Sequence, residues 1–87
     1  MTVNELYVSK GNVVGSTFVF MIMENGTPIL MWYMGNSSVK EHNPTINKKT
    51  NGSMVIEYGS PNLFGVRQTL PFVDANGELE EKWEKIK

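Results

Sequence analysis

An Asn25-Gly26 pair between two apolar runs is the feature that most constrains the fold of this chain. Such a pair is the strongest short-range signal for a β-hairpin, because a two-residue type I′ turn needs positive φ at both central residues. We therefore predict a central hairpin over residues 13–34, with its turn at residues 25–26.

A two-residue turn also predicts the register of the hairpin. Phe20 would lie opposite Met31, and Met21 would lie opposite Leu30. One face would then be the core side, made of Phe18, Phe20, Ile22, Ile29, Met31 and Tyr33. The second face would carry Val19, Met21, Met23, Leu30, Trp32 and Met34. Because an ordinary half-buried hairpin has one polar face, something must cover the second apolar face.

We interpret this second face as an interface between protein chains. Methionine and aromatic residues are enriched at interfaces, where the unbranched thioether adapts to its partner. Leaving five large apolar side chains in water would cost on the order of 10 kcal/mol, which is comparable to the stability of a whole domain. We therefore expect a homo-oligomer, most simply a two-fold dimer. The alternative is an intramolecular cover, in which a terminal helix packs on one face and a second hairpin on the other.

The C-terminal segment has the apolar spacing of an amphipathic helix. Leu79, Trp83 and Ile86 recur at i, i+4 and i+7, with charged residues between them. We predict a helix over residues 78–86, preceded by a turn at residues 74–77. The predicted fold class is therefore α+β: an antiparallel sheet of four to six strands with one C-terminal helix. Residues 2–10 fit either a short helix or a strand, and both interpretations stay open.

Length and composition limit the classes of function that the chain can have. A chain of 87 residues forms a single small domain over residues 1–87. Its net charge of −1 argues against binding to nucleic acid or to an anionic membrane. The absence of cysteine excludes disulfides, thiolate nucleophiles and cysteine-based metal sites. Residues 1–5 lack the charged and apolar regions of a signal peptide, so we expect a cytoplasmic protein.

Catalytic and metal-binding motifs are not recognisable in the sequence. His42 is the single histidine, and neither a nucleophile nor further metal ligands are marked near it. We therefore expect no enzyme activity, no cofactor and no metal. The polar segment of residues 35–52 is long for a connection in a small domain, which favours a functional loop. Folded over the last strand, it would complete a pocket for a phosphate-bearing small molecule such as a nucleotide, lined by Tyr33, His42, Lys48, Lys49, Tyr58 and Arg67.

These observations lead to two functional hypotheses. The first is a non-enzymatic intracellular interaction module that self-assembles, or binds and inhibits a larger protein. Its small size and its composition, rich in lysine, glutamate and asparagine, favour an accessory protein of a phage or mobile element. The second hypothesis is a small-molecule binding protein that sequesters its ligand in the predicted pocket.

Overall fold

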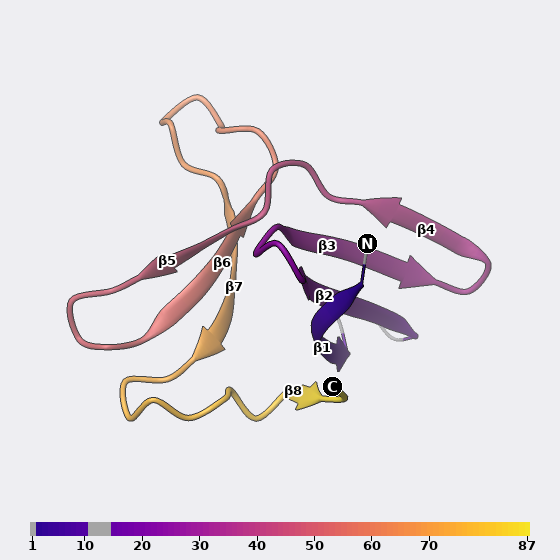
Figure 1. Cartoon of the computed structure of the whole chain (residues 1–87). Helices are drawn as coiled ribbons and strands as arrows, with labels where there is room; N and C mark the ends of the chain where they lie inside the picture. Colours follow the sequence, from indigo (N-terminus) through magenta and orange to yellow (C-terminus); the bar gives the residue numbers. More distant parts are fainter. Residues whose placement is uncertain (1, 11–14) are drawn as a thin grey trace.

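The computed structural model describes residues 2–10 and 15–87, and these residues form two antiparallel β-sheets (Figure 1). The strand order is β4-β3-β2-β1-β8 in the five-stranded sheet and β5-β6-β7 in the three-stranded sheet. The strands are β1 (Val3–Lys10), β2 (Ser16–Met23), β3 (Pro28–Met34), β4 (Ser37–Lys40), β5 (Thr45–Lys48), β6 (Met54–Tyr58), β7 (Gln68–Val73) and β8 (Trp83–Lys85). Within the described ranges there is no helix of the length and apolarity needed to span a membrane.

The predicted antiparallel sheet is confirmed, but the C-terminal helix and the α+β class are wrong. Residues 78–86 form an isolated bridge at Leu79, a turn at residues 81–82 and strand β8, which pairs with β1. The indole of Trp83 is buried in the core, whereas Ile86 is 54% exposed, so the apolar residues of the predicted helix do not share one face. Burial of a large side chain contributes about 1.5–3 kcal/mol. An exposed i, i+4 ion pair contributes only a few tenths, so packing of the extended segment outweighs the local helical signal.

Residues 2–10, for which the sequence leaves helix and strand open, contain β1. This strand lies between β2 and β8 in the five-stranded sheet. Tyr7 and Ser9 are buried on its inner side, while Leu6 and Val8 alternate with them on the other side. The alternation with a period of two is the pattern of a strand with two different faces.

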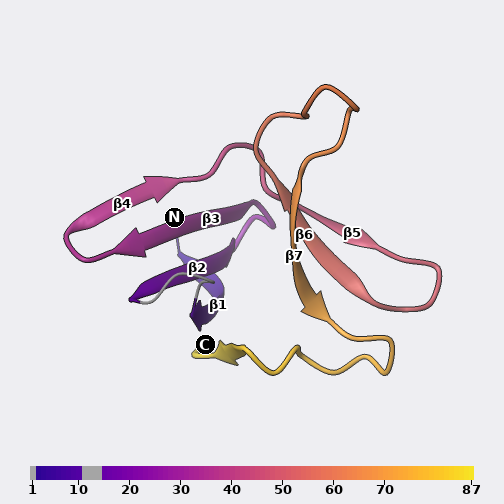
Figure 2. The ribbon, with the colours of Figure 1, turned by 180° about the vertical axis from the view of Figure 1, so that it is seen from behind.

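The core lies between the two sheets and is largely aromatic. Its buried members are Tyr7, Phe18, Phe20, Leu30, Ile56, Tyr58, Leu70, Phe72 and Trp83. Phe72 is central to it, because it makes edge-to-face contacts with Tyr7 (ring centroids 4.9 Å apart) and with Trp83 (5.9 Å). Figures 1 and 2 show the C-terminal segment running from the end of β7 to the edge of β1. This segment therefore connects the two sheets on one side of the core.

The central hairpin is formed by residues 16–34, whereas residues 13 and 14 of its predicted range lie outside the described residues. Its turn and its register differ from the prediction. Met23 donates its N–H to the Thr27 carbonyl oxygen (2.9 Å), and Gly26 donates to the Met23 carbonyl oxygen (2.8 Å). Gly26 has a φ of +88°, whereas Asn25 does not have positive φ. This is the three-residue loop in which a type I turn is followed by a left-handed glycine in a G1 bulge.

The extra loop residue shifts the pairing by one position. Phe20 pairs with Leu30, and Val19 pairs with Met31. A shift of one residue turns every side chain of the shifted strand to the other face. Leu30 and Trp32 therefore point to the core, and the side chains predicted for the core on this strand, Ile29, Met31 and Tyr33, point outward.

Candidate functional site

The outward side of the three-stranded sheet has the ordinary polar character. On β6 the buried residues Ile56 and Tyr58 alternate with Val55 and Glu57, which are half-buried on the other side. The Asn47 side-chain amide donates a hydrogen bond to Glu57 Oε2 across the ladder (3.2 Å). The outward residues of this sheet, called here the control face, are Thr45, Asn47, Val55, Glu57, Thr69 and Pro71.

The outward side of the five-stranded sheet is largely apolar across its three central strands, with Thr17 and Lys10 as the polar residues of the row that begins at Tyr33. Its apolar residues, called here the outer face, are Leu6, Val8, Val19, Met21, Ile29, Met31 and Tyr33. None of these residues belongs to the core cluster or to the side chains packed against it. Six of them are half-buried, and Tyr33 is 38% exposed. The two sheets of one small protein thus differ sharply on their outward sides.

Charged residues mark the two edges of the outer face. The pairings join Lys40 to Met31, Met31 to Val19, Val19 to Val8, and Val8 to Glu84. These five residues therefore form one row across all five strands, with a lysine at the β4 edge and a glutamate at the β8 edge. Lys40 and Glu84 are both exposed. An apolar centre with a polar rim is the usual anatomy of a protein interface.

A second exposed apolar feature is the loop that connects β6 to β7, called here the Leu63–Phe64 loop (Figure 1). Leu63 is 100% exposed and Phe64 is 88% exposed. The loop has a defined conformation, because Asn62 Oδ1 accepts hydrogen bonds from the N–H groups of Phe64 (2.8 Å) and Val66 (3.1 Å). Strand β7 begins only after this loop, at Gln68.

Arg67 forms hydrogen bonds between the base of this loop and residues 41–44, called here the crossing segment. This segment connects β4 in one sheet to β5 in the other. Its Nε donates to the Gly59 carbonyl oxygen (2.9 Å), and its terminal nitrogens donate to Thr45 Oγ1 (3.2 Å) and to the carbonyl oxygens of His42 (3.4 Å) and Asn43. The planar guanidinium suits this arrangement, since it presents several donors in a rigid fork. Arg67 is thus occupied by three backbone carbonyls and the Thr45 hydroxyl, whereas the sequence assigns it to a ligand.

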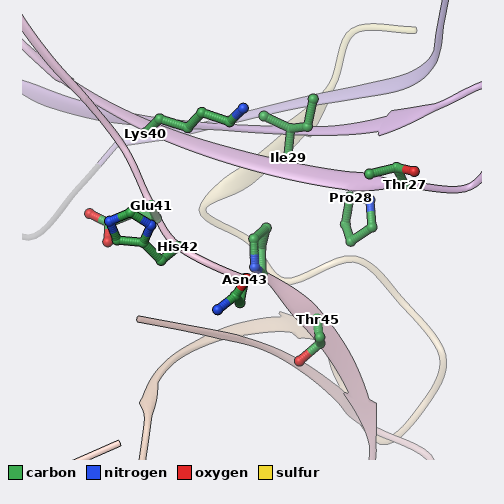
Figure 3. A pocket seen from close by; sticks show the side chains of 9 residues that line it. Thr27, Pro28, Ile29, Lys40, Glu41, His42, Asn43 and Thr45 are labelled. Atoms are coloured by element: carbon green, nitrogen blue, oxygen red, sulfur yellow. The ribbon is translucent and has the colours of Figure 1, made fainter. Parts of the chain in front are cut away.

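The crossing segment borders an open pocket of about 620 Å³ (Figure 3). Figure 3 shows Glu41 and His42 at one end of this pocket and Thr27 and Pro28 at the other. The full lining is Thr27, Pro28, Ile29, Lys40, Glu41, His42, Asn43, Pro44 and Thr45.

The six residues predicted for a ligand pocket are not brought together here. Only His42 lines this pocket. Tyr33 lies on the outer face, and Lys48 and Lys49 lie at the other end of β5, next to the turn into β6. Tyr58 is in the core, where its hydroxyl donates to Gln68 Oε1 (3.3 Å). Burial, together with the nearby charge of Glu41, raises the pKa of Tyr58.

The predicted interface residues divide between the two sides of the five-stranded sheet. Val19 and Met21 lie on the outer face, with Met23 at its end, as the alternation along β2 indicates. The remaining three are on the core side: Leu30 is fully buried, Trp32 packs against the core, and Met34 pairs with Ser16 at the end of the strand.

The sequence analysis misses five outer-face residues. It assigns Ile29, Met31 and Tyr33 to the core side because of the shifted register. The period-two pattern of Leu6 and Val8 is the signal that could have placed β1 beside them.

Within the described ranges, no three histidine, aspartate or glutamate side chains are grouped so that they could hold a metal ion. Comparisons with known protein families, curated proteins and solved structures found no match.

Proposed function

We propose that this chain is a non-enzymatic interaction module that binds protein through the outer face. The supporting observation is the contrast between the two sheets: four of the six control-face residues are polar, whereas the outer face consists of seven large apolar or aromatic residues. Contiguous apolar patches larger than a few hundred Å² are rare on monomeric proteins and mark interaction sites. The outer face is therefore a surface on which a partner gains from excluding water.

The outer face has the chemistry of a sheet-packing surface. Two β-sheets pack face to face with their side chains interdigitated about 10 Å apart, and strands aligned within about 30°. Met21 and Met31 lie near the centre of the outer face, where a flexible thioether adapts to the shape of a partner. Packing of this kind needs no preformed cavity.

Site-specific photo-crosslinking tests this function. Benzoylphenylalanine is introduced at Met31 on the outer face or at Val55 on the control face, which is half-buried in the same way. Each protein is irradiated alone and in a bacterial lysate. We expect protein adducts several times more abundant from position 31 than from position 55. Equal yields from the two positions, or no adducts from either, would overturn the proposed function.

The Leu63–Phe64 loop offers a second surface for a protein target. A fully exposed leucine next to an 88% exposed phenylalanine presents apolar area, and the Asn62 hydrogen bonds reduce the backbone-ordering cost on binding. Benzoylphenylalanine at Phe64 separates the two surfaces. An adduct of different mass from that at position 31 would assign a separate partner to the loop, whereas no adduct at position 64 would remove the loop from the proposal.

A further inference from the structure

We propose that the partner of the outer face is a second copy of this chain, packed face to face about a two-fold axis that runs parallel to β2. The proposal rests on the protein-binding function argued above and names the partner of the same surface. It follows from the order of charges across the five-stranded sheet.

The charged row is complementary to itself under this one rotation. Lys40 lies at one end of the row, Val19 on the central strand and Glu84 at the other end. A two-fold axis parallel to β2 exchanges the two edges of the sheet, so that β4 of one copy lies over β8 of the other. Lys40 then faces Glu84 of the second copy, and the symmetry repeats this pair on the opposite edge. Val19 lies near the axis and faces its own equivalent, as isologous contacts require.

A two-fold axis that lies in the plane of the interface but runs perpendicular to the strands also keeps the strands aligned, and it brings like charges together. It places β4 over β4, so that Lys40 meets Lys40 and Glu84 meets Glu84. Like charges placed opposite each other across an interface are unfavourable and exclude that arrangement. The edge charges therefore select the orientation, while the apolar centre supplies the attraction.

The size of the outer face indicates a dimer that dissociates on dilution. Four inter-strand spacings of about 4.8 Å give a width of about 19 Å from β4 to β8. Along β3 the outer face extends from Tyr33 to Ile29, a length of about 14 Å at about 3.4 Å per residue. With the surrounding rim, two such faces bury on the order of 1,000 Å², the lower limit for a specific interface. We accordingly expect dissociation in the micromolar range.

Sedimentation velocity over a concentration series tests the partner. The wild-type mass should rise from 9.8 kDa to twice that value as the concentration increases. Val19→Lys should stay at 9.8 kDa, because two lysines would meet near the axis. Val55→Lys is the matched control, since it places the same change on the central strand of the control face, and it should dimerise like the wild type. Circular dichroism of each variant checks that the β-sheets are retained.

Charge reversal tests the axis. Lys40→Glu makes both edges acidic and Glu84→Lys makes both edges basic, so each variant alone should dimerise at least tenfold more weakly than the wild type. An equimolar mixture of the two should form a heterodimer, and the double variant should recover the wild-type affinity. Both positions are exposed, so folding is not at risk.

The outcomes separate this proposal from the broader function. A wild type that stays at 9.8 kDa at every concentration would overturn the second copy as partner. Adducts of another mass from position 31 would then leave the protein-binding function standing, and a lack of adducts would overturn both. Val55→Lys dissociating the dimer while Val19→Lys does not would move the contact to the control face and overturn the proposal. Single charge variants that dimerise like the wild type, or a mixture without heterodimers, would overturn the axis.

Discussion

The Trp83 indole donates a hydrogen bond of 2.7 Å from Nε1 to the backbone carbonyl oxygen of Pro71. This bond joins the segment that ends in β8 to strand β7 of the other sheet. Trp83 is only 5% exposed, and its ring meets the edge of Phe72 at an interplanar angle of 87°. The Trp83 side chain therefore holds the C-terminal segment both to the backbone of β7 and to the aromatic core.

Removing this side chain should destabilise the whole protein. We expect Trp83→Phe to lower the free energy of unfolding by about 1–3 kcal/mol, because the Pro71 carbonyl loses its partner in a part-buried hydrogen bond. Trp83→Ala should cost about 3–5 kcal/mol, since it also leaves a cavity. Urea unfolding followed by circular dichroism measures both, with the fully exposed Leu63→Ala as the control. A Trp83→Ala variant no less stable than that control would show that the C-terminal segment is not docked.

The C-terminal segment also shows which part of the fold local sequence cannot supply. Leu79, Trp83 and Ile86 have helical spacing, and the surrounding charges pair well at i, i+4. The competing strand gains its stability from β1, at the other end of the chain, and from Phe72, which lies before the turn at residues 74–77. The helical spacing within the segment carries no information about those contacts, and their packing outweighs the local preference for a helix.

The central hairpin shows the opposite case, in which a local signal is right about the element and wrong about its register. Asn25-Gly26 fits a two-residue loop as well as the last two positions of a three-residue loop. The choice between them depends on whether Leu30 or Met31 faces the core, and this is decided by packing across the sheet. The alternation along β2 does not depend on the turn, so Val19 and Met21 were placed on the correct side, whereas every residue of β3 was reversed.

The same turn recurs before β6, and its glycine should be more sensitive to substitution. Gly52 (φ +96°) and Gly26 (φ +88°) have the same left-handed conformation. A Cβ at Gly26 would meet nothing within 4 Å, but one at Gly52 would lie 3.3 Å from the Ala75 carbonyl oxygen. Gly26→Ala should therefore cost about 1–2 kcal/mol of unfolding free energy from the backbone alone, and Gly52→Ala should cost more. Urea unfolding of the two variants measures the difference. Equal losses of stability in the two variants would contradict the close approach of Gly52 to the Ala75 carbonyl oxygen.

Arg67 should control how firmly the crossing segment is held. We expect Arg67→Ala to remove about 1.5–3 kcal/mol from the local stability of the loop base, the range for hydrogen bonds with a charged partner. The Gly59 amide, which donates to the His42 carbonyl oxygen (2.8 Å), reports on this region by hydrogen exchange and should exchange at least tenfold faster. Arg67→Lys should restore little, because an ammonium lacks the planar fork. The Asp74 amide, bonded to the Glu78 carbonyl oxygen in another turn, is the internal control. Equal acceleration of both amides would indicate global destabilisation and contradict a local role.

Tyr7 should make the protein sensitive to alkaline pH. Burial and the hydrogen bond that its hydroxyl donates to Glu5 raise the pKa of Tyr7 to about 12, whereas an unfolded tyrosine titrates near 10. The unfolded chain therefore loses its proton first. The contribution of Tyr7 is fully present below pH 10 and is lost as the pH rises toward 12, on the order of 2 kcal/mol.

The measurement is the unfolding free energy at pH 8 and pH 11 for the wild type, Tyr7→Phe and Tyr58→Phe. Tyr7→Phe should have the smaller loss of stability at pH 11, because phenylalanine has no proton to release. Tyr58→Phe should keep the Tyr7 contribution, while removing the part that comes from the raised pKa of Tyr58 itself. A wild type and a Tyr7→Phe variant that lose the same stability between the two pH values would contradict a buried, hydrogen-bonded Tyr7 hydroxyl. They would also place the sensitivity to alkali elsewhere in the chain.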